Sequence, residues 1–153
     1  MKKQKGFSLI ELLIVVAIIL IIAAIAIPNL IKSKMAANQS GAASTTRTIV
    51  SGEATYVAVC TQAGYSATLK ELNTGAVCAA GANIIDPVLA TGTKSGYKFT
   101  EAGTLTTFTA SATPVTVGTT GQNMFCTDQV GVIYFDPAGA ACVIGAPSIV
   151  LGN

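Results

Sequence analysis

The chain has 153 residues, of which 51% are hydrophobic and only 10% are charged, and its formal net charge is +2. This composition excludes an intrinsically disordered chain, which needs low hydrophobicity and high net charge, and it supplies no strongly basic surface for nucleic acid. Histidine is absent, so a Ser-His-Asp triad and a histidine-ligated metal site are excluded as well.

The N-terminus has the pattern of a short basic leader followed by a membrane-spanning helix. Three lysines precede Gly6, and residues 7–31 then contain a single charged side chain, Glu11. A helix needs about 20 mainly apolar residues to cross the hydrocarbon core of a bilayer, so this run is long enough. Because positive residues stay on the cytoplasmic side, the C-terminal part of the chain is expected to lie outside.

Three interpretations of this N-terminus compete. Ala24-Ile25-Ala26 mimics the cleavage site of a secretory signal peptide, but the apolar run is longer than the usual apolar region of about 7–15 residues. A plain membrane anchor explains the lysines and the length but gives Glu11 no role. A carboxylate at the centre of a span costs about 2.5–3.5 kcal/mol, so such a residue is expected to be functional. The third interpretation assigns it a function.

Residues 6–11, Gly-Phe-Ser-Leu-Ile-Glu, followed by the apolar helix, resemble the N-terminal motif of type IV prepilins. The six-residue leader with Phe7 after it is similar to the type IVa subclass, and Pro28 also fits the family. The resemblance covers about residues 1–35. It implies that a membrane-embedded prepilin peptidase cuts between Gly6 and Phe7 and N-methylates Phe7.

Cleavage at this position would retain the apolar segment, the opposite of ordinary signal removal. Removing six residues from 153 leaves a mature chain of 147. Nine basic and seven acidic side chains become six and seven, so the net charge changes from +2 to −1. The basicity of the precursor therefore belongs mainly to its leader.

Cleavage would also create a partner for Glu11. The new α-amine at Phe7 is largely protonated at neutral pH, because its reference pKa is about 7.7–8.0. Phe7 and Glu11 are one helical turn apart, so a contact within one chain is possible. The resemblance implies that Glu11 instead pairs with the amine of a neighbouring subunit during assembly. An alternative left open is a glutamate at the membrane edge that reaches lipid headgroups.

The apolar segment has no polar side chain between residues 12 and 27. A helix that is apolar all round must be buried on every side, either in lipid or among copies of itself. Pro28 lacks an N–H and crowds the carbonyl of Ala24, which predicts either a simple kink or a local loosening. The resemblance to pilins favours loosening of residues 21–28 in a fibre, with the helix of the monomer merely bent.

The remaining sequence predicts an α+β fold. Residues 32–60 are expected to extend the helix, with an amphipathic face made by Thr46, Ile49, Val50, Glu53, Tyr56, Val57 and Cys60. Residues 61–153 are expected to form an extracytoplasmic β head, with a helical turn at 65–73, strands at 96–100, 105–111, 123–127 and 132–135, and a hairpin turn at 128–131. The prediction is a long helix packed on an antiparallel sheet of about four strands, which is also the pilin fold that the resemblance implies.

Four cysteines, Cys60, Cys78, Cys126 and Cys142, lie outside the membrane on this topology, where disulfides form. Three connectivities are possible and the sequence does not choose between them. We favour the local pairs Cys60–Cys78 and Cys126–Cys142, each of which would stabilise by about 3 kcal/mol in the chain-entropy model. A zinc site is disfavoured because the spacings lack C-x-x-C pairs. No metal is expected.

Two other motifs are interpreted as structural or as chance matches. Asp86, Asp128 and Asp136 do not form a D-x-D-x-D-G calcium loop and are better explained as turn residues. Residues 38–40, Asn-Gln-Ser, match a glycosylation sequon, but such triplets are frequent by chance.

The resemblance predicts a structural subunit of a type IV pilus, which polymerises through its N-terminal helix into a surface fibre for adhesion, motility or DNA uptake. The alternative is a major pseudopilin of a type II secretion system, since the motif is common to both. The implied partners are copies of the chain, the prepilin peptidase, an inner-membrane assembly platform and the membrane. Binding of nucleic acid is left open, and neither a cofactor nor a catalytic residue is expected. The precursor is expected in the inner membrane and the mature chain in an extracellular fibre.

Overall fold

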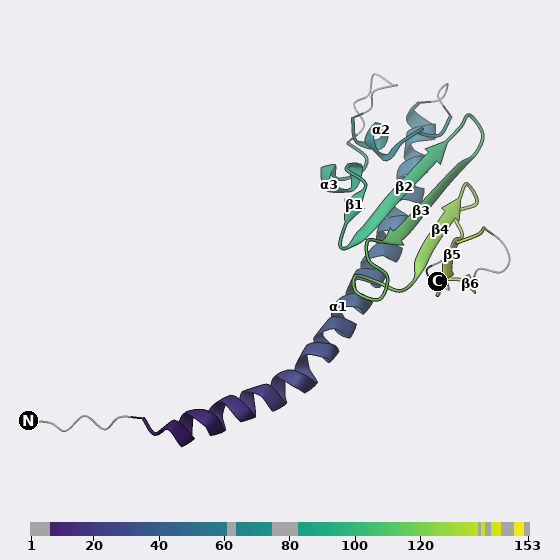
Figure 1. The fold of residues 1–153 in the computed structure, drawn as a ribbon. Helices are drawn as coiled ribbons and strands as arrows, with labels where there is room; N and C mark the ends of the chain where they lie inside the picture. Colours follow the sequence, from purple (N-terminus) through teal and green to yellow (C-terminus); the bar gives the residue numbers. More distant parts are fainter. Residues whose placement is uncertain are drawn as a thin grey trace, which may run out of the picture. The chain divides into compact units, whose positions relative to one another are not determined.

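The computed structural model describes residues 7–60, 64–74, 83–137, 139, 142–144 and 149–151. The chain falls into two units, Met1–Lys34 and Met35–Asn153, and each is described by itself. Helix α1 (Leu9–Val59) contributes its first part to one unit and its second part to the other. All further helices and strands among the described residues belong to the second unit (Figure 1).

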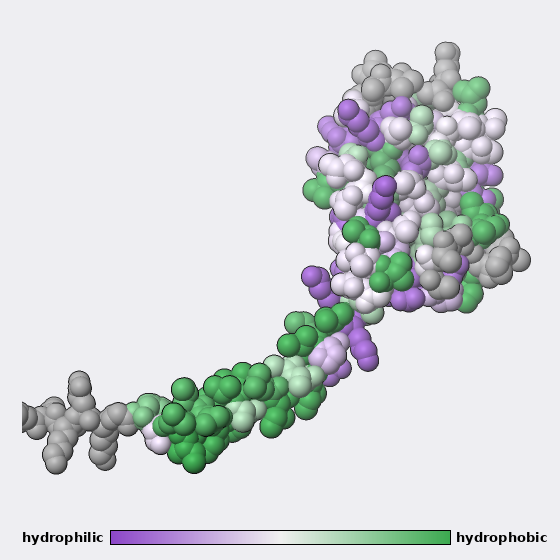
Figure 2. All heavy atoms as spheres, in the orientation of Figure 1, coloured by the Kyte–Doolittle hydropathy of each residue, from purple (hydrophilic) through white to green (hydrophobic). Residues whose placement is uncertain are grey.

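The first unit consists of the apolar part of α1. Its large apolar side chains, from Phe7 to Ile31, have exposed fractions between 44% and 85%. Figure 2 shows them covering the visible face of this segment. The helix is long and apolar enough to cross a membrane, as the sequence predicts. A helical surface that is apolar on all sides requires lipid or other helices around it.

The second unit contains a six-stranded antiparallel sheet in which sequential strands are neighbours. Its strands are β1 (Thr93–Lys94), β2 (Tyr97–Gly103), β3 (Phe108–Pro114), β4 (Met124–Asp128), β5 (Ile133–Asp136) and β6 (Ile149–Val150). The four predicted strands correspond to β2–β5. The prediction of about four strands missed β1 and β6. Each of these strands has two residues, which are too few for an alternating pattern to be recognised.

The second part of α1 packs against one face of this sheet (Figure 1). All seven residues of the predicted amphipathic face are buried or half-buried, so the predicted face is confirmed. The sheet contributes alternate residues, including Tyr97 and Phe99 of β2 and Phe108 of β3. The buried face of the helix, which repeats about every 3.6 residues, and the alternate buried residues of the strands thus form one core. This shared core holds the helix on the sheet.

Two short helices, α2 (Leu69–Thr74) and α3 (Pro87–Ala90), lie between α1 and the sheet in the chain. Helix α2 overlaps the predicted helical turn of residues 65–73, and its Leu69 and Leu72 are buried. Asp86 begins α3: its carboxylate accepts a hydrogen bond from Leu89 N at 2.9 Å and another from Lys94 Nζ at 2.8 Å. These hydrogen bonds, that of Lys94 above all, lower the pKa of Asp86.

The predicted hairpin turn joins β4 to β5. Asp128 Oδ1 accepts a hydrogen bond from Val130 N at 3.0 Å, and the Asp128 carbonyl accepts one from Gly131 N at 2.9 Å. Gly131 has a φ of +80°, a backbone conformation that favours glycine. Asp86 and Asp128 therefore hold a helix start and a turn, in agreement with their interpretation as turn residues.

A disulfide joins Cys126 of β4 to Cys142, with a Cα–Cα distance of 5.7 Å. It is one of the two predicted pairs, and it attaches the segment that follows β5 to the interior of the sheet. Cys60 is buried at the end of α1. Its predicted partner Cys78 lies outside the described residues, so the pair Cys60–Cys78 stays a prediction.

We expect the double substitution Cys126→Ser and Cys142→Ser to lower the free energy of unfolding by about 3 kcal/mol, because the closed loop no longer restricts the unfolded chain. Urea denaturation of the full chain in detergent, followed by tyrosine fluorescence, measures this difference. Ser111→Ala, on the neighbouring strand β3, serves as the control. An unchanged midpoint in the double variant would contradict the expectation.

Candidate functional site

The residues of the predicted processing motif lie at the beginning of α1. Phe7 is 85% exposed and precedes the helix by two residues. Gly6 lies outside the described residues, so the geometry of the predicted cleavage site is not described. The structure therefore describes residues 7–11 of this motif, which lie just before the apolar helix and in its first turn.

Glu11 closes the N-terminal end of α1. Its Oε2 accepts a hydrogen bond from Ser8 N at 2.9 Å, and the Ser8 carbonyl accepts the first helical hydrogen bond, from Leu12 N at 3.3 Å. Ser8 is thus the N-cap residue and Glu11 the third residue of the helix. This arrangement is the carboxylate half of a capping box, and it places a negative charge at the positive end of the helix dipole.

The sequence interpretation missed this local role of Glu11. The signal was present, because Ser8-x-x-Glu11 before an apolar run is the sequence pattern of a capping box. The hydrogen bond with Ser8 gives the carboxylate a partner within its own chain, which reduces the cost of carrying it at the edge of an apolar helix. It also holds the carboxylate beside the backbone from which cleavage would generate the amine of Phe7. Pairing of Glu11 with that amine stays a prediction.

The helix continues without interruption through Pro28. Asn29 Nδ2 donates a hydrogen bond to the Ile25 carbonyl at 3.1 Å, and Ser33 Oγ donates one to the Asn29 carbonyl at 3.0 Å. These bonds satisfy polar groups within the helix itself, which a segment in or near lipid requires. Pro28 leaves the helix of the monomer intact, and loosening of residues 21–28 in a fibre stays a prediction.

The chemistry of the first unit is that of a membrane or assembly helix. A single carboxylate stands at its beginning, and the exposed Lys32 and Lys34 follow the apolar run at its other end. Lysines at such a position can extend to the polar interface while their stems lie along apolar surface. No described side chain of this unit forms a nucleophile–base pair, and most of its described surface is apolar.

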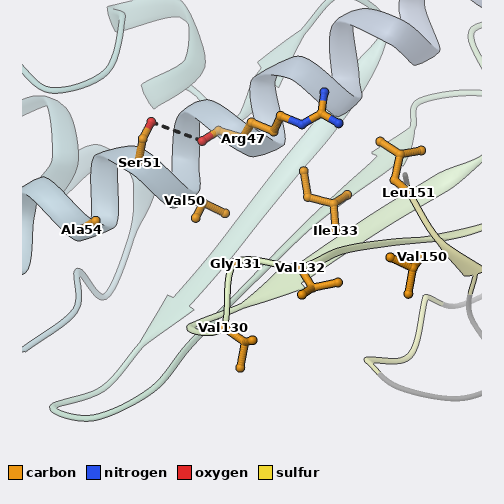
Figure 3. Close-up of a pocket in the computed structure, with 10 residues that line it drawn as sticks. All are labelled: Arg47, Val50, Ser51, Ala54, Val130, Gly131, Val132, Ile133, Val150 and Leu151. Atoms are coloured by element: carbon orange, nitrogen blue, oxygen red, sulfur yellow. Dashed lines mark hydrogen bonds between the residues drawn. The ribbon is translucent and has the colours of Figure 1, made fainter. Parts of the chain in front are cut away.

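The second unit carries a groove of about 660 Å³ between α1 and the β4–β5 hairpin (Figure 3). It is lined by Arg47, Val50, Ser51 and Ala54 of α1, by residues 130–133, and by Val150 and Leu151. Its lining is mainly apolar, and Arg47 is the charged residue among those drawn. Among the described residues, no three His, Cys, Asp or Glu side chains gather closely enough to hold a metal ion.

The sequon asparagine has a structural contact. Asn38 Nδ2 donates a hydrogen bond to the Thr120 carbonyl at 2.8 Å and is partly buried, linking α1 to the turn that precedes β4. Nδ2 is the atom to which an N-linked glycan would be attached. Its use in this contact agrees with the interpretation of the triplet as a chance match.

Comparisons with known proteins place the similarity at the N-terminus. The family described as "Prokaryotic N-terminal methylation motif" matches residues 1–27. The chain is 58% identical over 40 residues to the "Type IV wide pilus major component PilA4" of Thermus thermophilus, which covers 26% of this chain and 30% of that protein. It is 62% identical over 40 residues to the "Type IV major pilin protein PilA" of Myxococcus xanthus, covering 26% of this chain and 18% of that protein.

The chain thus spans less than a third of the length of either relative in these alignments. No solved structure matches it significantly. The predicted resemblance to type IV prepilins is nevertheless confirmed, because an N-terminal methylation motif matches residues 1–27 and both relatives carry the names of type IV pilus proteins. The chain carries, at residues 1–27, the N-terminal methylation motif of type IV prepilins.

Proposed function

We propose that the chain is a structural subunit of a type IV pilus, made as a prepilin and polymerised through residues 7–31. One observation carries this proposal: the methylation motif at residues 1–27 leads into an apolar helix whose large side chains are all exposed. Such a surface is not stable in water and needs lipid or other helices around it. The names of both relatives, a major pilin and a major pilus component, support the same function.

In this proposal the leader 1–6 is removed on the cytoplasmic face by a prepilin peptidase, which also methylates Phe7. The precursor waits in the inner membrane as a single-pass protein, and an inner-membrane assembly platform transfers it into an extracellular fibre. The role is structural and includes no catalysis. Nucleic acid is not part of the proposal, because the mature net charge of −1 gives no broad basic surface.

Assembly is driven by packing rather than by removal of apolar surface from water. Lipid tails are as apolar as the Ile, Leu and Val side chains of this helix, so its transfer from lipid to a helix bundle gains little hydrophobic free energy. Close contact between helices and the pairing of charged groups must therefore determine how the helices of neighbouring copies pack in the fibre. A Glu11 carboxylate facing the Phe7 amine of a neighbouring copy would fix the axial register, even where its net contribution to stability is small.

Electron microscopy of fibres sheared from the cell surface tests this function. We expect long fibres that contain the mature chain as their main component and disappear when its gene is deleted. A chain that stays in the membrane fraction, with no surface fibre, would contradict the proposal and favour the alternative of a major pseudopilin, whose fibre is short.

A further inference from the structure

Two carboxyl groups lie inside the second unit, one on α1 and one on β2. Glu53 is 0% exposed on the helix face that packs on the sheet. Glu101 is on the same side of β2 as the buried Tyr97 and Phe99. Both of its carboxyl oxygens are buried and, among the described residues, have no hydrogen-bond partner. A buried ionised carboxylate without a donor is strongly unfavourable, so the state of Glu101 needs an explanation.

The donors of the neighbouring loop are used by Glu53. Ser66 N donates a hydrogen bond to Glu53 Oε2 at 3.1 Å, and Ser66 Oγ donates a short one to Glu53 Oε1. Both hydrogen-bond donors of Ser66, its N–H and its hydroxyl, thus bind the Glu53 carboxylate. Both oxygens of Glu53 therefore accept a hydrogen bond, whereas neither oxygen of Glu101 does.

Backbone contacts hold Ser66 against the end of β2, close to Glu101. Tyr65 N donates a hydrogen bond to the Thr104 carbonyl at 2.9 Å. A Cβ atom added to Gly103 would lie only 2.0 Å from the Ser66 carbonyl oxygen, so the two backbones are in direct contact. Glu101 precedes Gly103 by two residues and therefore lies on the same face of the strand.

Among the described residues, no lysine or arginine forms an ion pair or hydrogen bond with either carboxyl. Tyr56 of α1 is buried, and the pKa of Tyr56 is raised by burial, by Glu71 and by Glu53. Glu71 of α2 is a third carboxylate, and it accepts a hydrogen bond from Ala67 N at 2.8 Å. On β3, the residue opposite Glu101 is Ala110. Lys70 of α2 is exposed and lines a shallow pocket together with Glu101, but the ion pair found among the described residues joins Lys94 and Asp86.

We propose that Glu101 is held as a neutral carboxylic acid that donates its proton to the Glu53 carboxylate, and that this shared proton clamps residues 64–66 between α1 and the end of β2. Glu53 then receives hydrogen bonds from Ser66 N, Ser66 Oγ and the Glu101 hydroxyl. The clamp goes beyond the proposed function and does not depend on it. In agreement with this arrangement, burial above all, together with the neighbouring Glu53 carboxylate, raises the pKa of Glu101 to about 10.

The pH dependence of this clamp has a definite sign. Glu101 has an ordinary pKa of 4.5 and a raised pKa of about 10 in the folded chain. Between these values the folded state binds one more proton than the unfolded state, so the unfolding equilibrium constant rises up to about tenfold per pH unit. The contribution of the clamp is complete below about pH 4.5 and is lost as the pH rises towards 10.

The composition of the chain makes this effect measurable. Since histidine is absent, the groups with an ordinary pKa between about 6 and 9 are the α-amine and cysteine thiols outside disulfides, and the unsubstituted chain shares these with Glu101→Gln. Carboxylates with a lowered pKa, such as Asp86, change the stability only at acid pH. A loss of stability across the neutral range that is absent from Glu101→Gln therefore reports on Glu101.

The experiment measures denaturant unfolding of the full chain in detergent from about pH 6 to 9. The unfolding constant of the unsubstituted chain is expected to rise up to about tenfold per pH unit, and that of Glu101→Gln to stay constant, because an amide donates to Glu53 without titrating. Asp128→Asn, in the hairpin turn, is the matched control and should behave like the unsubstituted chain. Equal pH dependence of the unsubstituted chain and Glu101→Gln would overturn the proposal.

Infrared spectroscopy provides a readout that does not require the variant to fold. At neutral pH the unsubstituted chain should show the carbonyl stretching band of a buried protonated carboxylic acid, and the band should disappear only in alkali. Absence of that band at neutral pH would overturn the proposal. So would stabilisation by added Ca²⁺ or Mg²⁺ that Glu101→Gln abolishes, because a cation rather than a proton would then join the two carboxyls.

Discussion

Replacing Glu11 by Leu is expected to leave membrane insertion and leader removal intact while abolishing fibre assembly. Insertion depends on the three lysines, which are unchanged, and on the apolar run, which the Leu side chain makes more apolar. Assembly, in contrast, loses the carboxylate that would pair with the Phe7 amine of a neighbouring copy. Immunoblots of membrane fractions and of sheared fibres measure the two steps separately.

The structure adds a control that separates the two roles of Glu11. In Glu11→Gln the amide oxygen can still accept the hydrogen bond from Ser8 N, so the cap is retained and the charge is lost. A cap contributes about 1 kcal/mol to a helix that lipid already stabilises, so its loss alone should have little effect on assembly. We therefore expect Glu11→Gln to fail in assembly as Leu does. Normal fibres from the Gln variant would show that the carboxylate serves only as a helix cap.

Replacing Gly6 by Val is expected to block leader removal almost completely and, with it, fibre formation. A β-branched side chain next to the bond before Phe7 would hinder the close approach of the peptidase, which glycine permits. The precursor should still insert, because its lysines and apolar run are unchanged. Electrophoretic mobility of the membrane-bound chain reports the retained leader.

Gln4→Ala, within the same leader, is the control for Gly6→Val and should be processed normally. Processing of the Val variant at the rate of the unsubstituted chain would contradict a role for Gly6. If the Gln4 variant also failed, the leader as a whole, rather than its last residue, would be recognised.

Local patterns predicted most of the fold. The helix face of residues 46–60 follows from a spacing of three and four residues, and β2–β5 follow from alternating β-branched and aromatic residues. The turn at 128–131 follows from its Asp and Gly. In contrast, β1 and β6 are positioned by pairing with neighbouring strands, which no two-residue pattern reveals.

The buried carboxyl pair could not be predicted for a related reason. Glu53 lies within the predicted apolar face, so its burial was expected, but its partners were not. Glu101 is distant along the chain, and its burial depends on how the loop that contains Ser66 crosses the end of β2. Only the tertiary structure brings these three side chains together.

The candidate site shows the opposite balance. Gly6, Phe7 and Glu11 are recognisable from the sequence because the methylation motif is a short continuous segment that needs no tertiary contact to be identified. The hydrogen bond from Ser8 to Glu11 is local too, and the Ser8-x-x-Glu11 pattern indicates it. The predicted partner of Glu11 belongs to another copy, which a single chain does not contain.

Mass spectrometry of the N-terminus of the chain isolated from its cells tests the central claim most directly. We expect a polypeptide that begins at Phe7, carries a methyl group on its α-amine and retains the whole apolar helix. A chain that begins at Ile27, after signal-type cleavage, or one that keeps Met1 would contradict the assignment of residues 7–31 as an assembly helix.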